Sequence, residues 1–407
     1  MNVWFINHYA TSPYSAGGNR PFSLCKELAA RGHQVVLICC TFNHQTRLDE
    51  FPDKTWTYGT QDIDGVRFVW IDGPAYEVND LHRVQNMITF TRRVLRLADT
   101  GGRLPRPDVV LGSSPHLLTP WAAARVADAY GVPYVLEVRD IWPASIVDIH
   151  GMHRANPVVV GLAQLERSVS TRASQIVSVL PGGVDHLVEL GVDPDRVTWI
   201  PNGVDFTLMP PSTDAPGREP LTLMYAGAHG LANGLGVLVA AAALLEAGDA
   251  RGRIRWVFIG NGPEKPALIA QAERLGLTNV AFEDTIAKSA IYTRLADADA
   301  FVANVRDEAL YRFGVSLNKF FDYMAVARPT IVGMDSPWNP FASNGAGITV
   351  RPDDPEAFAD GVLELLAMSQ TERAEMGARG RAFVQEGHDF HVLGEKLEQV
   401  LQRATEQ

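Results

Sequence analysis

A lysine and an aspartate three residues apart are the side chains of this sequence best suited to hold an anionic sugar compound. Lys319 and Asp322 lie in a segment, residues 313–331, that reads as a loop, a helix and a strand. Residues three apart share one helix face. A cation close to the free N–H groups of a helix N-terminus suits a phosphate, and a carboxylate one turn later suits sugar hydroxyls. The pattern predicts a nucleotide-sugar clamp, with an ordinary capped helix as the alternative.

Two glycine-rich turns follow strand-like runs and could bring the backbone close to a ligand. Gly17 and Gly18 lie between the run at 3–6 and a helical stretch, and Gly262 follows the run at 254–260. Glycine at such a junction lets the chain approach a phosphate. Neither turn is a G-x-G-x-x-G, so the dinucleotide fingerprint is absent. A flexible surface loop is the alternative for the first turn.

Charged residues end another strand-like run. Arg139 and Asp140 stand at the carboxyl end of the run at 134–139, and Trp142 follows them. In open α/β sheets such residues point into the crevice that binds ligands. The alternative is a buried ion pair between the two side chains that only positions a loop.

No group of residues predicts a metal site or an activated nucleophile. The eleven histidines form no His-x-x-x-His pair, the three cysteines form no cluster, and no G-x-S-x-G is present. Three Asp-x-Asp pairs occur in turns or at helix ends, where carboxylates are common. We therefore expect no metal ion and no cofactor.

Short strand-like runs alternate with helical stretches along the chain, which is typical of parallel sheets with crossover helices. Strands are expected at 3–6, 34–40, 66–71, 108–113, 134–139, 175–180, 197–200, 221–226, 254–260, 280–283, 300–305, 329–334 and 347–350. Helices are expected at 18–31, 83–98, 117–130, 155–172, 182–190, 234–247, 264–275, 287–296, 316–326, 355–367, 371–386 and 391–404.

A Pro- and Gly-rich stretch between 201 and 217 has the composition of a linker. We expect domains at 1–205 and 221–386, with a linker at 206–220. The last segment, 387–407, is expected to form a helix that packs across the junction or onto the first domain.

Composition and charge exclude several classes of protein. A chain of 407 residues is too long for one ordinary core, and a net charge of −11 argues against a nucleic-acid binder. Residues 1–205 hold 18 Lys and Arg against 21 Asp and Glu, whereas residues 206–407 hold 18 against 26. No signal peptide and no apolar run long enough to span a membrane is apparent, so we expect a cytoplasmic protein.

One basic helical stretch could meet a membrane surface. Six arginines lie between residues 83 and 106, and Asp99 is the only acid between 81 and 107. A single apolar stripe accompanies them, formed by Leu81, Val84, Met87, Ile88, Thr91 and Leu95. Such a helix can lie on anionic lipid at the inner face of the plasma membrane. Alternatively, it packs its stripe on the sheet and leaves its arginines in solvent.

Five motifs follow one another along the chain. They are Ser15-Ala-Gly-Gly18 leading to Leu28-Ala-Ala-Arg-Gly-His-Gln-Val35, then Pro201-Asn-Gly-Val-Asp205, Tyr225-Ala-Gly227, Ile259-Gly-Asn-Gly-Pro263 and the segment 313–331. In this order they resemble the retaining glycosyltransferases of family 4, which have the GT-B fold. Residues 138–143 and 316–324 are most similar to the subgroup that includes N-acetylfucosamine transferases of surface-polysaccharide assembly.

The resemblance implies two Rossmann-like, doubly wound parallel-sheet domains that face a central cleft. The second domain would hold a nucleotide-sugar donor and the first a saccharide or lipid-linked acceptor. The donor would be a UDP-linked N-acetylated amino sugar or deoxysugar, transferred with retention and without a metal in polysaccharide or glycolipid assembly. The alternatives are a GT-B sugar-nucleotide epimerase and a catalytically silent partner protein with the same fold.

The resemblance also implies roles for individual residues. Lys319 would hold the phosphate and Asp322 the ribose, while Asp140 and Arg139 would act at the reaction centre. The residues expected to bind the donor are Gly17, Gly18, Arg20, Asn202, Gly227, His229, Asn233, Gly262, Ser316, Leu317, Lys319 and Asp322. The residues expected to meet the acceptor are His8, Tyr9 and Trp142.

Two departures from the family pattern concern the donor. Gly314 stands where the family's first acidic residue would fall, and Ala228 and Asn233 stand where many members have an Arg and a Lys. A diphosphate leaving group needs cations or aligned N–H donors. Lys319 is therefore expected to neutralise more of this charge than its counterpart usually does.

Overall fold

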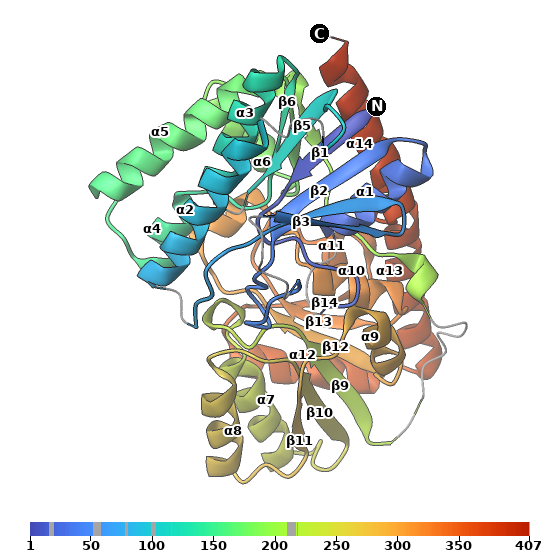
Figure 1. Cartoon of the computed structure of the whole chain (residues 1–407). Coiled ribbons are helices and arrows are strands. Elements are labelled where there is room, and N and C mark those ends of the chain that lie inside the picture. The colour runs from blue at the N-terminus through green and yellow to red at the C-terminus, as the bar shows by residue number, and fades with distance from the viewer. Residues whose placement is uncertain are drawn as a thin grey trace. The chain divides into compact units, whose positions relative to one another are not determined.

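The structure is a computed structural model that describes residues 1–15, 20–51, 58–77, 80–98, 103–114, 116–209, 217 and 219–406. The chain divides into two compact units (Figure 1). Unit 1 comprises Met1–Asn202 and Phe390–Gln407, and unit 2 comprises Gly203–Asp389. Each unit is built on its own sheet with helices on both faces. The predicted pair of parallel-sheet α/β domains is confirmed.

Unit 1 contains an eight-stranded sheet in the order β3-β4-β2-β1-β5-β6-β7-β8. Its strands are β1 (Asn2–Ile6), β2 (Gln34–Cys40), β3 (Tyr58–Ile63), β4 (Val66–Ile71), β5 (Val109–Ser113), β6 (Tyr134–Val138), β7 (Gln175–Ser178) and β8 (Val197–Trp199). All neighbours are parallel except β3 and β4. The chain reverses its direction of winding between β1 and β5, and open sheets of this kind bind ligands beyond the carboxyl ends of the strands at such a point.

Helices cover both faces of this sheet because its central strands bury side chains on each side. In β1, Trp4 and Ile6 join one core, while Val3 and Phe5 join the other. The helices are α1 (Arg20–Ala30), α2 (Leu81–Leu95), α3 (Leu118–Tyr130), α4 (Ala144–His150), α5 (Pro157–Arg172), α6 (Gly183–Glu189) and α14 (Phe390–Thr405), with 3-10 turns η1 (Arg96–Ala98) and η2 (Pro194–Arg196). Burial on both faces explains why these strands read as unbroken apolar runs.

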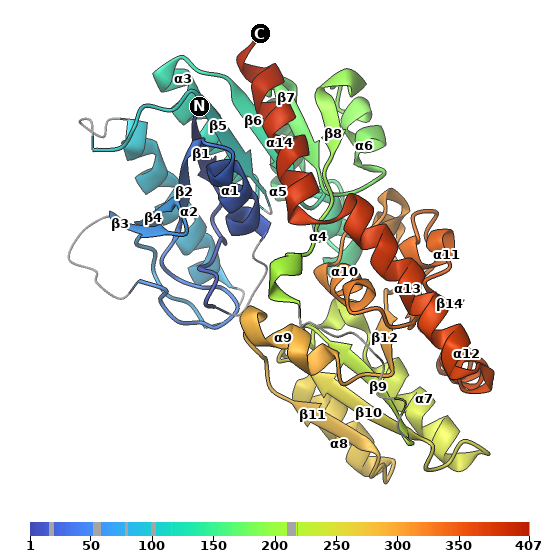
Figure 2. The same cartoon turned by 90° about the vertical axis from the view of Figure 1, so that its right-hand side faces the viewer.

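The C-terminal helix α14 belongs to unit 1, although it follows unit 2 in the sequence. Leu393 and Leu397 lie in the core that α1 also lines, and Figure 2 shows the two helices next to each other. A Cβ added at Gly394 would lie 2.5 Å from the Cβ of Glu27, so glycine permits the close approach of α14 to α1. Most of the expected linker at 206–220 lies outside the described residues.

Unit 2 contains a six-stranded, fully parallel sheet in the order β11-β10-β9-β12-β13-β14. Its strands are β9 (Leu221–Ala226), β10 (Ile254–Ile259), β11 (Val280–Glu283), β12 (Ala300–Asn304), β13 (Thr330–Gly333) and β14 (Gly347–Val350). Its helices are α7 (Gly236–Ala247), α8 (Lys265–Arg274), α9 (Lys288–Leu295), α10 (Asn318–Ala325), α11 (Pro340–Asn344), α12 (Pro355–Ala367) and α13 (Gln370–Gly387), with 3-10 turns η3 (Phe206–Leu208), η4 (Leu231–Asn233) and η5 (Ala309–Phe313). Residues of α7, α8 and α12 line the core on one face, and residues of α9 and α10 line the core on the other.

The expected elements agree with the structure to within three residues at each end, but among the described residues one strand and two α-helices were missed. Strand β3 is an edge strand of polar composition that pairs antiparallel with β4, so it carries no apolar run. Helices α4 and α11 are seven and five residues long. That is too short for the helical apolar period to appear in a sequence.

Candidate functional site

The predicted clamp in unit 2 is built by β9, the loop that follows it and α10. Lys319, in the first turn of α10, donates from Nζ to the hydroxyl of Tyr225 at 3.1 Å and to Oδ1 of Asn233 at 2.5 Å. Its Nζ also lies 4.7 Å from the centre of the Tyr225 ring. The amide nitrogen of Asn233 donates to the carbonyl of Ala228 at 3.0 Å, and the Tyr225 hydroxyl donates to the same carbonyl at 2.8 Å. One ammonium group is thereby held in place by three segments.

Lys319 is a cation with neutral neighbours. Burial lowers the pKa of its ammonium to about 7. Its hydrogen-bond partners are a phenol and an amide, and within the described part of the chain it forms no ion pair with a carboxylate. A desolvated ammonium without a counter-ion gains strongly from a nearby negative charge. The arrangement therefore favours an anionic ligand at this position.

The N-terminus of α10 adds hydrogen-bond donors beside this cation. Leu317 is the N-cap residue, and no side chain caps the helix there. The first N–H groups of a helix have no partner within it, and they favour an anion together with the helix dipole. Gly314, just before this segment, has a φ of 85°. An acidic side chain would be strained in that conformation, which gives a physical reason for the first departure from the family pattern.

Asp322 is almost fully buried and is held by two residues of α9. Its Oδ1 accepts hydrogen bonds from Nζ of Lys288 and from the hydroxyl of Tyr292, both at 2.6 Å. Its Oδ2 accepts none from the described residues. Sequence reasoning missed Lys288 and Tyr292, although their spacing of four residues places them on one helix face. They orient the carboxylate and leave one oxygen for a ligand.

The loops after β9 and β10 interlock through glycines. A Cβ added at Gly260 would lie 1.9 Å from the carbonyl oxygen of Gly227, and one at Gly262 would lie 2.3 Å from that of His229. The His229 ring is buried beside Tyr225, and burial lowers its pKa to about 4. The backbone N–H of Gly227 donates to Ile259 at 3.0 Å. The structure gives these residues a packing role beside Tyr225, and their direct contact with a donor stays a prediction.

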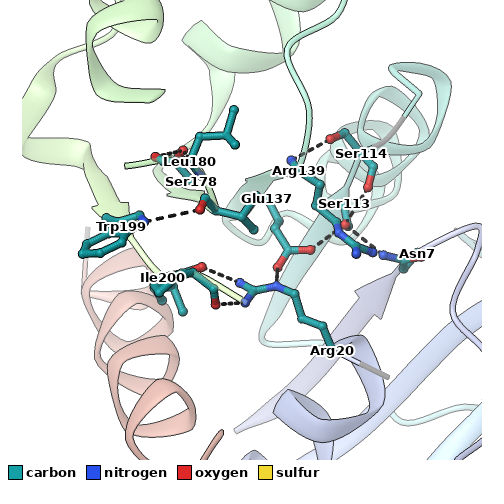
Figure 3. Close-up of polar contacts among 12 residues, drawn as sticks. Asn7, Arg20, Ser113, Ser114, Glu137, Arg139, Ser178, Leu180, Trp199 and Ile200 are labelled. Atoms are coloured by element: carbon teal, nitrogen blue, oxygen red, sulfur yellow. Dashed lines mark hydrogen bonds and ion pairs between the residues drawn. The ribbon is translucent and has the colours of Figure 1, made fainter. Parts of the chain in front are cut away.

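Arg20 is predicted to bind the donor, but its guanidinium is used within unit 1. It donates to Glu137 at 2.9 Å, to the carbonyl of Ile200 at 2.8 Å and to the carbonyl of Pro201. The side chains of the ion pair are at most 1% exposed. Figure 3 shows Glu137 between Arg20 and Ser113, whose hydroxyl donates to the carboxylate at 2.5 Å. Arg20 thus joins α1 to β6 and to the segment after β8, and its contact with a donor stays a prediction.

The buried carboxylate of this network is ionised at neutral pH. Burial alone would raise the pKa of Glu137, but Arg20 and Arg139 outweigh burial and hold it below its usual value. Gly17 and Gly18, which are expected to close over the diphosphate, lie outside the described residues.

Arg139 and Asp140 follow directly on β6, at the edge of the sheet where they are expected. Burial lowers the pKa of the Arg139 guanidinium and raises the pKa of the Asp140 carboxyl. The backbone N–H of Arg139 donates to Ser114 at 2.9 Å, and Oδ1 of Asp140 accepts from the N–H of Ile141 at 2.9 Å. The two side chains form no ion pair with each other. The alternative of a buried Arg139–Asp140 ion pair that only positions a loop therefore does not hold. Trp142, two residues on, is partly buried.

His8 is predicted to meet the acceptor, but it is enclosed. Its ring stacks between Tyr9 and Phe90, with centroid distances of 4.5 and 4.2 Å. Its Nδ1 lies 2.6 Å from Nε2 of His116, and its Nε2 lies 2.7 Å from Oδ1 of Asn86. Both ring nitrogens are engaged and the side chain is buried, so His8 supports its neighbours, and its direct contact with an acceptor stays a prediction.

Tyr9 and Asn202 are the remaining predicted residues, and the first is half-buried while the second is buried. Tyr9 is half-buried and its hydroxyl lies 3.4 Å from Nε of Arg83. Asn202 is buried at the point where the chain passes from unit 1 to unit 2.

Helix α2 does not present its apolar stripe to one side only. Met87 and Thr91 are buried, whereas Leu81, Val84 and Ile88 are 83%, 45% and 38% exposed. Contact of this helix with anionic lipid stays a prediction. The described part of the chain contains no helix with the length and apolar character needed to cross a bilayer. Among the same residues, no three His, Cys, Asp or Glu side chains gather where they could share a metal ion.

Two family models match the sequence, one after the other along the chain. Residues 17–203 match the model described as a glycosyl transferase 4-like domain, and residues 220–368 match the model described as glycosyl transferases group 1. A search of curated proteins with this sequence finds no match.

Several solved structures share this architecture over nearly the whole chain. Sucrose-phosphate synthase from Thermosynechococcus elongatus is 16% identical with a TM-score of 0.77, covering 99% of this chain and 98% of its own. HepE from Anabaena, in complex with UDP and glucose, is 13% identical with a TM-score of 0.68, covering 99% of each chain. The UDP-forming α,α-trehalose-phosphate synthase from Burkholderia vietnamiensis is 14% identical with a TM-score of 0.70, covering 99% of this chain and 100% of its own. Likeness at these identities shows the fold, which is GT-B.

Proposed function

We propose that the chain transfers a sugar from UDP to an acceptor hydroxyl with retention of configuration. It belongs to the nucleotide-sugar-dependent glycosyltransferases, with a glycosyl transferase 4-like domain followed by a domain of the glycosyl transferases group 1. The observation that carries the proposal is the desolvated ammonium of Lys319, which forms no ion pair with the described residues and lies beside the start of α10, where no side chain caps the helix. UDP is favoured because it appears in the names of the HepE complex and of the trehalose-phosphate synthase. An N-acetylated amino sugar or deoxysugar donor, and a polysaccharide or glycolipid product, follow from the resemblance to N-acetylfucosamine transferases.

The proposed reaction needs no enzymic nucleophile and no protein base. The bond between the anomeric carbon and the β-phosphate oxygen breaks, and the acceptor oxygen forms a bond to the same face of that carbon. The departing phosphate oxygen takes the acceptor's proton, so the products are UDP and the glycoside. Negative charge builds up on the diphosphate in the transition state. Lys319 and the amides of Ser316 and Leu317 would stabilise this charge. Donors that are already in position contribute most where charge develops in the transition state.

Asp322 is proposed to hold the donor's ribose through its free Oδ2. Replacing Asp322 by asparagine keeps the shape and turns an acceptor into a donor. We expect the KM for the UDP-sugar to rise about tenfold, because a hydrogen bond to a charged group contributes roughly 1.5–3 kcal/mol. The kcat should change little, because the ribose contact is the same in the ground state and the transition state. Steady-state kinetics check this, and a lowered kcat at unchanged KM would contradict the ribose assignment.

The acceptor is proposed to bind unit 1. Tyr9 and Trp142 would contact it, and Asp140 with Arg139 would orient the reacting sugars at the carboxyl end of β6. Asn202, at the boundary of the two units, would shape the hinge. A saturating acceptor should protect part of the fluorescence of the eight wild-type tryptophans from quenching, and this protection should be lost in Trp142→Phe. Failure of every active acceptor to do so would remove Trp142 from the acceptor site.

The pH dependence of the reaction should report on Lys319. Its pKa of about 7 in the free protein means that the cation needed for the diphosphate is lost as the pH rises through that value. The kcat/KM for the donor reports free-enzyme pKa values, so it should fall above about pH 7, by up to about tenfold per pH unit. The variant Lys319→Arg stays protonated and should remove this fall. A wild-type profile that is flat between about pH 6 and 9 would contradict the assignment.

The activity itself is tested by incubating the purified chain with UDP-sugars and saccharide or lipid-linked acceptors. We expect acceptor-dependent release of UDP and a product whose anomeric configuration, read by NMR, equals that of the donor. An epimerase would isomerise the donor sugar without any acceptor. A catalytically silent partner protein would bind UDP-sugar and release no UDP in either condition.

A further inference from the structure

Two arginines of unit 1 lie beside one cluster of aromatic side chains. Arg47 lies in the loop after β2, and Arg83 lies in the first turn of α2. Within the described part of the chain, neither guanidinium pairs with a carboxylate. Both are only half-buried, so they can still meet a ligand. Unpaired arginines of this kind differ from Arg20, which the fold uses completely.

Tyrosine and histidine side chains connect the two arginines. The guanidinium carbon of Arg47 lies 5.0 Å from the centre of the Tyr76 ring, and that of Arg83 lies 5.8 Å from the centre of the Tyr9 ring. The hydroxyl of Tyr76 lies 2.7 Å from Nδ1 of His44, which lies 3.4 Å from an Nη1 of Arg47. The Tyr9 and His44 rings are 5.3 Å apart. The cluster is therefore continuous from one arginine to the other.

The positive charge of this cluster comes from the arginines. Burial, and then the charges of Arg83 and Arg47, lower the pKa of His44 to about 4. Burial and Arg83 lower the pKa of His116 to about 3, and burial also lowers that of His8. All three imidazoles are neutral at pH 7. The cluster thus presents two positive charges, together with phenol and imidazole groups that can form hydrogen bonds.

The fold places these residues beyond the carboxyl ends of neighbouring strands and holds Arg47 there. Tyr9, Arg47 and Tyr76 follow β1, β2 and β4, which are neighbours in the sheet and end at one edge. The loop that carries Arg47 is fixed by Asn43, whose Oδ1 accepts from two backbone N–H groups and whose amide donates to Glu50 at 2.6 Å. Arg47 itself has a φ of 61°, a costly conformation for a residue with a side chain. A merely solvated arginine does not require such a loop.

We propose that Arg47 and Arg83, with the hydroxyls of Tyr9 and Tyr76, bind the phosphate of a phosphorylated acceptor. The inference rests on the proposed function, because it names the class of acceptor for that reaction. Guanidinium groups match phosphate oxygens in geometry and form charge-assisted hydrogen bonds with them. A phosphate monoester carries a charge of about −1.5 to −2 at pH 7, which balances two arginines better than one carboxylate does.

Two sources of such a phosphate are compatible with the cluster. One is a free sugar phosphate, and the other is a saccharide linked to a lipid through a diphosphate. Leu81 and Val84, which flank Arg83 on α2, are 83% and 45% exposed and could lie against a lipid chain. The first is a monoester and the second a diphosphate diester, but both present negatively charged phosphate oxygens to the arginines, so the test separates the sources with two probes.

Titration calorimetry with the full chain tests the proposal, with glucose 6-phosphate and farnesyl diphosphate as probes. We expect at least one probe to bind the wild type. The affinity of the wild type for that probe should fall at least about tenfold, equal to about 1.4 kcal/mol, in each of the single variants Arg47→Ala and Arg83→Ala. Arg92→Ala removes an exposed arginine from the same helix and should leave the affinity unchanged. Tighter binding of glucose 6-phosphate identifies a free sugar phosphate, and tighter binding of farnesyl diphosphate identifies a lipid-linked acceptor.

Lys319→Ala distinguishes this site from the donor site of unit 2. It should bind the phosphate probes as the wild type does. The proposal would be overturned if probe binding were lost in Lys319→Ala and kept in both arginine variants. It would also be overturned if glucuronate bound as tightly as the phosphates, or if neither probe bound. Failure of the proposed donor function would appear separately, as the absence of UDP binding to the same protein.

Discussion

Replacing Lys319 by alanine is expected to lower the kcat/KM for the nucleotide sugar by about 100-fold or more, which is the usual cost of removing one transition-state charge donor. The reason is that the sequence has no cation at two positions where many family members have one. Ala228 and Asn233 stand where many family members have cations. In the structure Asn233 accepts a hydrogen bond from Lys319 at 2.5 Å, so it orients the lysine and supplies no charge of its own.

Steady-state kinetics at pH 6.5, on the protonated side of the pKa of about 7, measure this effect. Arg274→Ala removes an exposed cation from α8 of the same unit and serves as the matched control. Lys319→Arg should recover part of the activity, because it restores charge with a different geometry. A value for Lys319→Ala within about twofold of the wild type, against the 100-fold or greater loss expected for such a donor, would remove Lys319 from the diphosphate site.

Breaking the buried ion pair of unit 1 should have the largest effect on stability. Glu137→Gln is expected to lower the free energy of unfolding by about 3–5 kcal/mol, because it leaves Arg20 buried and unpaired. Arg20→Met leaves the opposite charge and should cost a similar amount. Urea denaturation followed by tryptophan fluorescence measures both. Asp62→Asn in the exposed Arg67–Asp62 pair is the control and should cost less than about 1 kcal/mol.

The dependence of the free energy of unfolding on pH in acid gives a second test of the same ion pair. The pKa of Glu137 is lowered in the folded protein, so its contribution is complete above the unfolded pKa of a glutamate. It is lost as the pH falls through the lowered folded value. Glu137→Gln should therefore flatten the loss of stability in acid. A variant as stable as the wild type at neutral pH would show that the pair contributes nothing to the fold.

The strands and long helices could be predicted from the sequence because their signals are local. Helix α10 shows this, since Phe320, Phe321 and Met324 face the core as its spacing predicts, and Lys319 points to other neighbours. Strand β3 escaped because an exposed edge strand needs no apolar run. Its position in the sheet follows from its antiparallel pairing with β4, which no apolar pattern within β3 indicates.

The candidate site could be predicted less completely, because its contacts join residues far apart in the chain. Arg20 meets Glu137 and Ile200, which are 117 and 180 residues away, so its engagement within unit 1 could not be read from the sequence around it. Lys288 reaches Asp322 across 34 residues. Nothing local to either residue marks that partnership.

Binding of UDP and of uridine to the wild type and to Lys319→Ala, measured by titration calorimetry, tests the central claim most directly. The claim is that unit 2 holds a nucleoside diphosphate with Lys319 on the phosphates. We predict that Lys319→Ala binds UDP about tenfold to a hundredfold more weakly, as expected for a charged hydrogen bond, and binds uridine as the wild type does. Equal affinity of both proteins for UDP, or an equal loss for UDP and uridine, would contradict the claim.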